Sequence, residues 1–459
     1  MTYEERLIDY VVAARDRELD PGARVAAIRF LQDSYAVGLS GSRVSFVDAL
    51  KRAVLAGSHE AHVWGTGETG NAATVAMINA YQIHNQEWDC VHEPAVVHPM
   101  AVILSVLTAA AERLGSVPGE GFLRAVSTAV DVAAVLGMCA DQPMRFFRPG
   151  WCGGFGAVAG LAILHDSSTV ILRNALGIAY SSFGGTMQAH AEGSSTLPLQ
   201  IAMSARSAVT AFDLAEAGVD GPQEFLTGPF GFLSLIESDG HAEEQFASLG
   251  TQREITRVSH KPFPTGRAAH GGLHGLRSLK EQHDFSVDDV ARVILRAPPL
   301  VCRLVARPAQ LTQGPAYARL CFPYLAATLL LTGAVTVEDF DEAKLVCPAR
   351  HNLAAKVSVE QDANTDPNAL SPQALHVQLS GGKELSITLP DVLGSPGCPL
   401  TETQHKRKFS AAIASARMPL SAASASDLYT AVARLADSDT SAVTRNLFNS
   451  YHGSSELSL

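Results

Sequence analysis

The chain has 459 residues, of which 47% are hydrophobic and only 18% charged, a composition that excludes a disordered protein and favours two or three packed domains. Its net charge of −11 argues against a nucleic-acid binder, because no surplus of basic residues is present to neutralise phosphates. A small anionic substrate remains compatible, since a local basic pocket can lie within an acidic protein.

The start of the chain and its cysteines indicate a cytoplasmic protein. The first residues lack the basic start and apolar core of a signal peptide, and apolar runs such as 100–111 are too short to span a bilayer, so no membrane partner is expected. The seven cysteines are scattered without a Cys-x-x-Cys pair. This pattern predicts reduced thiols and neither a disulfide framework nor a zinc site.

The first half of the chain is predicted to be helix after helix. Apolar residues recur at three- and four-residue steps, and the alanine-rich stretches suit close packing in a buried bundle. Strands and helices do not alternate here, which argues against a doubly wound sheet. The predicted helices comprise residues 4–15, 22–37, 46–56, 72–88, 99–114, 121–138, 153–164, 170–182 and 197–217.

The pattern changes after Pro264, where strand-like alternation begins and a hairpin turn is predicted at Gly381 and Gly382. The tail returns to helices and is expected to pack back on the first half. The sequence thus predicts a mainly α protein with a large helical domain, residues 1–265 and 396–459, and a smaller α+β domain, residues 266–395. Within the smaller domain the predicted strands are 288–297, 356–362 and the two arms of 376–389, and the predicted helices are 270–282 and 316–332.

Residues 259–270 gather ionisable groups at a place where the chain must turn. Two prolines flank Phe263, so this segment cannot be a helix interior. Proton transfer on a carboxylate substrate needs a titratable base and fixed positive charge, and a solvated basic loop is the alternative interpretation. The ionisable side chains are His260, Lys261, Arg267 and His270.

A second polar cluster fills the break between the predicted helices 72–88 and 99–114. Histidines and carboxylates are common metal ligands, but their spacing here matches no metal motif, so no metal site is predicted. The cluster consists of Glu87, Asp89, His92, Glu93 and His98.

Three further breaks carry polar residues. Arg145 and Arg148 precede a glycine-rich helix start, and the planar guanidinium matches a carboxylate, although ordinary surface arginines would look the same.

His190 is a candidate for proton transfer or for helix capping. Tyr324 begins an apolar helix, where a tyrosine is more often a core residue. Because no nucleophile motif or cofactor fingerprint occurs, the chemistry is expected to come from side chains alone.

Taken in order, the blocks at 87–99, 147–156, 260–264 and 318–324 resemble the MmgE/PrpD family, which includes 2-methylcitrate dehydratase, cis-aconitate decarboxylase and iminodisuccinate epimerase. The resemblance covers nearly the whole chain. It implies a helical domain, an α+β domain resembling chorismate mutase, and an active site between them. It also implies a homodimer that requires no organic cofactor.

Within the resemblance, His98, Lys261 and Tyr324 match polar active-site positions of the decarboxylase branch. Other positions differ from that branch, which weakens the expectation of cis-aconitate decarboxylation. Where the branch has Asp, Thr, His, Lys and His, this chain has Glu87, Val91, Arg148, Leu197 and Gly266.

We therefore expect a cofactor-independent epimerase of an amino- or imino-dicarboxylate such as iminodisuccinate. The alternatives are a dehydratase of a 2-methylcitrate-like hydroxy acid and a non-catalytic dicarboxylate-binding protein. Lys261 and His98 are the expected proton carriers and Tyr324 the expected donor to the intermediate. Further catalytic candidates are His92, His190 and His270, and the substrate-binding candidates are Arg145, Arg148, Arg267, Glu87 and Asp89.

Overall fold

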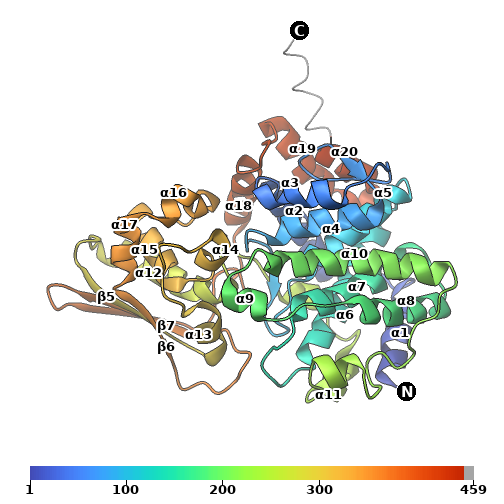
Figure 1. Cartoon of the computed structure of the whole chain (residues 1–459), viewed down its shortest axis with the longest axis horizontal. Coiled ribbons are helices and arrows are strands. Elements are labelled where there is room, and N and C mark those ends of the chain that lie inside the picture. The colour runs from blue at the N-terminus through green and yellow to red at the C-terminus, as the bar shows by residue number, and fades with distance from the viewer. Residues whose placement is uncertain (449–459) are drawn as a thin grey trace, which may run out of the picture.

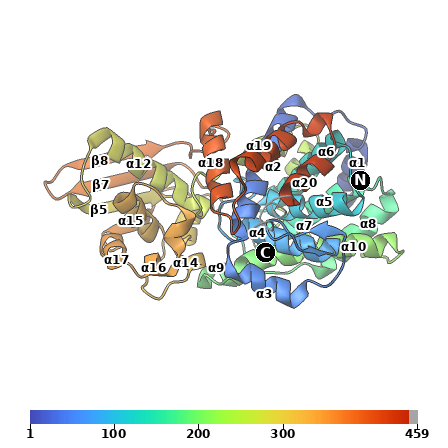
Figure 2. The ribbon, with the colours of Figure 1, turned by 90° about the horizontal axis from the view of Figure 1, so that it is seen from above.

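Two lobes make up the part of the chain that the structure describes, residues 1–448. In this computed structural model a large helical domain lies beside a smaller domain built on a sheet (Figure 1). Helix α18 (Glu402–Ala414) lies where the two lobes meet, as both views show (Figures 1 and 2). The predicted mainly α fold with a smaller α+β portion is confirmed.

Helices α5 (Pro99–Arg113) and α7 (Arg148–Leu164) form the centre of the helical domain and are buried over most of their length. Small residues let α7 approach α6 (Gly119–Met138) closely: a Cβ on Gly156 would lie 2.4 Å from the carbonyl oxygen of Ala129. The surrounding helices are α1 (Tyr3–Ala14), α2 (Pro21–Gly41), α3 (Ser45–Val54), α4 (Ala72–His84), α8 (Thr169–Ser182), α9 (Gln188–Glu192), α10 (Thr196–Glu216), α11 (Ala242–Ser248), α18, α19 (Ala422–Ala433) and α20 (Ser441–Phe448).

Helix α6 is the one helix among residues 1–448 that is long and apolar enough to cross a membrane. Of its apolar window, 89% is buried inside the protein. The core helix of a globular domain has the same property, because it is covered by neighbouring helices on all sides.

The smaller domain contains a four-stranded sheet in the order β6-β5-β7-β8. Strand β5 pairs with β6 in parallel and with β7 antiparallel, and β7 forms the predicted hairpin with β8. Helices α12 and α15 pack against the sheet and against each other. The elements are α12 (His270–His283), β5 (Val290–Ala297), α13 (Pro299–Val305), α14 (Pro315–Ala318), α15 (Phe322–Thr332), α16 (Glu342–Leu345), α17 (Pro348–Ala354), β6 (Val357–Gln361), β7 (Gln373–Leu379) and β8 (Glu384–Leu389).

Two short strand pairs lie within the helical domain, and one of them joins the two predicted polar loops. Strand β3 (Val91–His92) pairs antiparallel with β4 (Val258–Ser259). The segment after β4 is held from the other side by Gly394, whose carbonyl accepts from the His260 amide at 2.9 Å. Only glycine fits there, because its φ is +96° and a Cβ would lie 2.2 Å from the His260 carbonyl oxygen. The other strand pair is β1 (Ala61–His62) with β2 (Thr69–Gly70).

Two helices differ from their predicted bounds in ways that matter for the site. Helix α4 ends at His84 instead of residue 88, so the chain reverses earlier than its sequence pattern suggests. The predicted helix 316–332 is broken into α14 and α15 at residues 319–321, because Pro323 has no N–H and takes a place in the first turn of α15.

Candidate active site

A buried charged cluster lies where β3 and β4 bring the two loops together. The Lys261 ammonium lies 2.9 Å from Glu87 Oε2 and 3.7 Å from Asp89 Oδ1. All three side chains are buried, and the loss of hydration on burial is offset only where such charges neutralise one another. The structure thus brings together one predicted proton carrier and two predicted substrate-binding carboxylates.

Two imidazoles share the Asp89 carboxylate. His84 Nδ1 lies 2.9 Å and His98 Nδ1 3.2 Å from Asp89 Oδ2. The two rings meet edge to face with their centroids 4.7 Å apart. Asp89 therefore orients the His84 ring through a hydrogen bond. It lies within ion-pair distance of His98, whose Nδ1 makes no hydrogen bond with the described residues. Nε2 of His84 makes no hydrogen bond with the residues that the structure describes.

The backbone around this cluster is strained. Glu87 and Val96 have φ angles of 54° and 52°, in the left-handed region that residues other than glycine rarely adopt and that is least favourable for a β-branched residue such as valine. At Glu87 this conformation turns the chain back directly after α4, so that Asp89 faces His84. His98 then stands at the N-terminus of α5, just before the proline that opens the helix.

The cluster opens onto a cavity of about 60 Å³ between the two domains, enough for about four water molecules. His84, Glu87 and His98 form its charged end, and His190 lies on its wall. The remaining wall is mainly apolar. It includes Val91, Val96, Phe147, Met187, Leu197, Leu304, Leu320 and Leu370.

The pKa values of the two imidazoles are displaced in opposite directions. Burial lowers the pKa of His98, and the ammonium of Lys261 lowers it further. Burial also acts to lower the pKa of His84, but the carboxylates of Asp89 and Glu87 outweigh it and raise that pKa. Burial alone would raise the pKa of Glu87, yet the Lys261 charge holds it at about 2. Such a pair can divide the roles, with His98 as base and His84 as acid.

We expect a bell-shaped dependence of kcat/KM on pH. His98 must be neutral to accept a proton, so activity falls as the pH drops through its lowered pKa, below 6.5. His84 must be protonated to give one, so activity falls as the pH rises through its raised pKa, above 6.5. A pH–rate profile checks this, and a profile without a fall in activity on its basic side would contradict the assignment.

Two of the three predicted carboxylate-binding arginines are already paired with carboxylates, and the third lies outside the cavity wall. Arg148 forms a bidentate pair with Glu237, at 3.0 and 3.1 Å, and Arg145 is exposed and is not part of the cavity wall. Arg267 borders the cavity, but its Nε and Nη2 donate to Glu93 at 2.9 and 2.7 Å. Its other donors reach the carbonyl oxygens of His260, Val392 and Leu393. All five N–H groups of Arg267 are therefore used.

Tyr324 belongs to the core of the smaller domain and is not part of the cavity wall. Its hydroxyl donates to the Asp339 carbonyl at 2.7 Å and accepts from Arg350 at 2.9 Å. The geometry therefore gives Tyr324 a structural role in place of the predicted donor role.

Of the three second-tier histidines, only His190 reaches the cavity. Burial lowers the pKa of His190 to about 4, so it is neutral at physiological pH. His92 is completely buried and lies 2.8 Å from Glu254, and His270 is buried beside the Thr265 carbonyl at 3.2 Å. The last two hold the loops in place and do not face the cavity.

His84 was missed by the sequence analysis. It lies inside the predicted helix 72–88, where a histidine is more often a packed residue than an acid. The only feature of the sequence that could have identified His84 as a site residue is its position three residues before Glu87 and five before Asp89. That spacing becomes informative only when the helix ends at His84.

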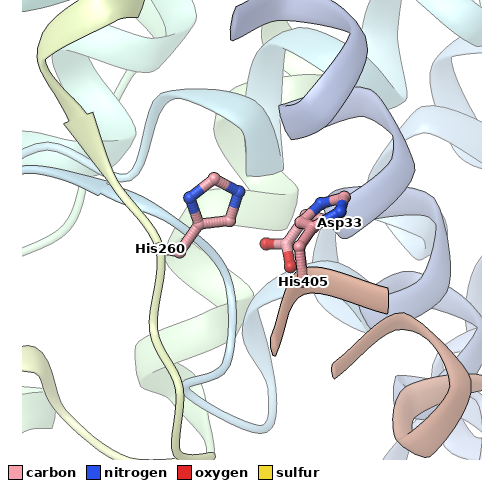
Figure 3. Close-up of side chains that lie close together, drawn as sticks. All are labelled: Asp33, His260 and His405. Atoms are coloured by element: carbon pink, nitrogen blue, oxygen red, sulfur yellow. The ribbon is translucent and has the colours of Figure 1, made fainter. Parts of the chain in front are cut away.

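Among residues 1–448, two groups of side chains have donor atoms close enough to hold a metal ion. The first is His84, Asp89 and His98, beside which the Lys261 ammonium already supplies positive charge. In the second, Asp33 from α2 faces His405 from α18, with His260 across from them (Figure 3). The ammonium of Lys408 lies 2.7 Å from Asp33 Oδ1. A lysine therefore neutralises the carboxylate in both groups.

We accordingly expect activity to survive metal removal. Incubation with EDTA followed by gel filtration should leave kcat within about twofold, since an ammonium already pairs with each carboxylate. Metal analysis of the purified chain is the control. Loss of activity that Zn²⁺ or Mn²⁺ restores would contradict this expectation.

Fold and site together describe a two-domain protein equipped for acid–base chemistry at its domain boundary. The MmgE/PrpD N-terminal domain model matches residues 5–245, and the MmgE/PrpD C-terminal domain model matches residues 263–427. The chain belongs to the MmgE/PrpD family.

Curated relatives extend over most of the chain. It is 27% identical to the cis-aconitate decarboxylase of Homo sapiens over 83% of this chain and 82% of the relative. It is also 27% identical to the Mus musculus cis-aconitate decarboxylase, over 91% and 88%. A cis-aconitate decarboxylase-like protein of Aspergillus oryzae is 25% identical over 88% and 89%. These similarities support an enzyme and favour a lyase over the predicted epimerase.

Proposed function

We propose that the chain is a lyase that acts on a small di- or tricarboxylic acid and needs no organic cofactor. The observation that carries the proposal is the pair of imidazoles on Asp89, with pKa values displaced in opposite directions, at the charged end of a cavity between the domains. A di- or tricarboxylate is larger than this cavity. The domains therefore separate to admit it and close again around it.

Lys261 does not line the closed cavity, so in this proposal the substrate carboxylate reaches its ammonium when the domains separate, and neutral His98 removes the proton next to that carboxylate. The ammonium of Lys261 stabilises the enolate-like charge that develops on the carboxylate. Protonated His84 then completes the reaction. It gives its proton to a leaving hydroxyl in a dehydration. In a decarboxylation, His98 first returns its proton to another carbon of the same enolate-like intermediate, and His84 then protonates the carbanion left when carbon dioxide departs.

The apolar wall favours the loss of carbon dioxide. A carboxylate placed against Leu197, Leu304 and Leu320 loses its hydration, which raises its energy relative to uncharged carbon dioxide. The relatives named as decarboxylases support the same reaction class. Dehydration of a hydroxy acid is the second candidate, since the same acid and base would serve it.

Proton NMR in deuterium oxide tests the proposal with cis-aconitate and 2-methylcitrate as substrates. Decarboxylation should consume cis-aconitate, release carbon dioxide and leave one deuterium in the product. Dehydration of 2-methylcitrate should replace its methyl doublet with a vinylic methyl singlet, or give an olefinic signal if the proton is taken from the CH2 carbon. Iminodisuccinate belongs in the same panel, because exchange of its α-proton without elimination would restore the epimerase interpretation. No reaction with any of the three would contradict catalysis on this substrate class.

A further inference from the structure

His190 presents a buried polar atom without a partner at the wall of the cavity. Its side chain is 8% exposed and lies on the wall between the two domains. Nε2 of the ring is buried and makes no hydrogen bond with residues 1–448. Burial, aided by the positive charge of Arg307, lowers the pKa of His190 to about 4, so the ring is neutral. A neutral imidazole carries its proton on one nitrogen, and the partner of the other nitrogen decides which one.

Arg307 of the smaller domain determines the position of that proton. It follows α13, two residues after Val305 of the cavity wall. Its Nη2 donates to the His190 carbonyl at 3.1 Å and lies 3.4 Å from His190 Nδ1. Because a guanidinium can only donate, Nδ1 is the acceptor in this contact and the proton is on Nε2. The Nε2–H group is therefore a buried donor without an acceptor, which is unfavourable unless a ligand supplies one.

Arg307 has a second donor group without a partner. Its Nη1 is buried and makes no hydrogen bond with the described residues. Arg148 and Arg267 are each paired with a carboxylate, whereas Arg307 forms no such pair among residues 1–448. Its guanidinium carbon lies 4.8 Å from the centre of the Tyr317 ring. An aromatic face supports a guanidinium and leaves its N–H groups available, so Arg307 is a positioned cation without an anion.

The two unpartnered donors are close enough to bind one anion together. One ring carbon separates Nδ1 from Nε2 in His190, and a single carbon joins Nη1 to Nη2 in Arg307. Because Nδ1 and Nη2 are 3.4 Å apart, Nε2 and Nη1 lie within the reach of the two oxygens of one carboxylate. One donor comes from each domain, since His190 belongs to α9, which lies at the edge of the helical domain that faces the smaller domain (Figures 1 and 2).

We propose that His190 and Arg307 bind a substrate carboxylate that does not react. The inference rests on the proposed function for the class of ligand, a di- or tricarboxylic acid, and it gives the carboxylate-binding role to an arginine that the sequence analysis did not single out. His84, Glu87 and His98 form the charged end of the same cavity. An acid with two carboxylates is therefore held at both places and links the domains, whereas an acid with one carboxylate is held at only one of them.

The binding of glutarate and of its monomethyl ester to the full chain tests the inference. The two carboxylates of glutarate have the spacing of the outer carboxylates of cis-aconitate, and the ester lacks one of these charges. Ligand-observed NMR titration gives the Kd of each. The wild type should bind the diacid about 10- to 100-fold more tightly, the gain expected for a hydrogen bond between charged groups. Arg307→Gln should abolish most of this preference, and His190→Phe should reduce it about 3- to 10-fold.

Arg292→Gln is the matched control, because Arg292 is exposed on β5 and pairs with Glu360. Its preference for the diacid should stay within about twofold of the wild type. Thermal unfolding verifies that each variant is folded, and His190→Phe decides if Arg307→Gln is not.

The outcomes separate the inference from the proposed function. A wild type that does not prefer glutarate to the ester overturns the inference, and so does an Arg307→Gln variant that binds both ligands more weakly by the same factor. Turnover of cis-aconitate or 2-methylcitrate would leave the proposed function standing in either case. If the chain converts neither acid but loses its preference for glutarate in Arg307→Gln, the binding site is supported and the proposed lyase reaction is refuted.

Discussion

Replacement of His98 by glutamine is expected to lower kcat by about 10²- to 10⁴-fold, the usual contribution of a general base. Glutamine retains a polar side chain of similar size beside Asp89 but cannot accept a proton. The fall in activity on the acidic side of the pH–rate profile should disappear as well, since it reports the protonation of His98. Steady-state kinetics of the folded variant measure both effects.

The control for His98→Gln is His165→Gln. His165 is also in the helical domain and pairs with a carboxylate, Glu216, at 3.3 Å, but it lies outside the cavity wall. Its kcat should stay within about twofold of the wild type. A His98→Gln variant that keeps more than a tenth of the wild-type kcat, with an unchanged pH profile, would show that another residue is the base.

Replacement of Lys261 by methionine is expected to abolish turnover and to destabilise the fold. Methionine has a similar length but leaves Glu87 and Asp89 buried without their neutralising charge. Breaking a buried ion pair from one side costs about 3–5 kcal/mol of the free energy of unfolding. Urea denaturation measures this loss. Lys406→Met, which removes an exposed lysine paired with Glu402, should cost less than about 1 kcal/mol.

A double variant separates the two effects of Lys261. Lys261→Met combined with Glu87→Gln removes the nearer carboxylate charge, so most of the lost stability should return. Activity should not return, because no ammonium faces the substrate. Recovery of turnover in the double variant would show that Lys261 only neutralises Glu87 and plays no part in the reaction.

The regular elements followed from local sequence pattern, since apolar periodicity depends on neighbours a few residues apart. Helix ends were harder to predict. Residues 85–88 continue the periodic pattern of α4, and only the reversal at Glu87 ends the helix at His84. Pro323 indicated that the predicted helix 316–332 could be interrupted. The sequence did not indicate that the interruption would place Arg319 in a buried position at the domain boundary.

By itself, the sequence determined the mainly α fold, the two polar loops and the presence of Lys261, Glu87, Asp89 and His98 in them. Only the tertiary structure decided which charges are free to bind a substrate. Arg267 is neutralised by Glu93, 174 residues away, and Arg148 by Glu237, 89 residues away. Such pairing depends on how distant segments meet. The same long-range contacts leave Arg319 buried without an ion pair to any carboxylate of residues 1–448, because the helix break places it at the domain boundary.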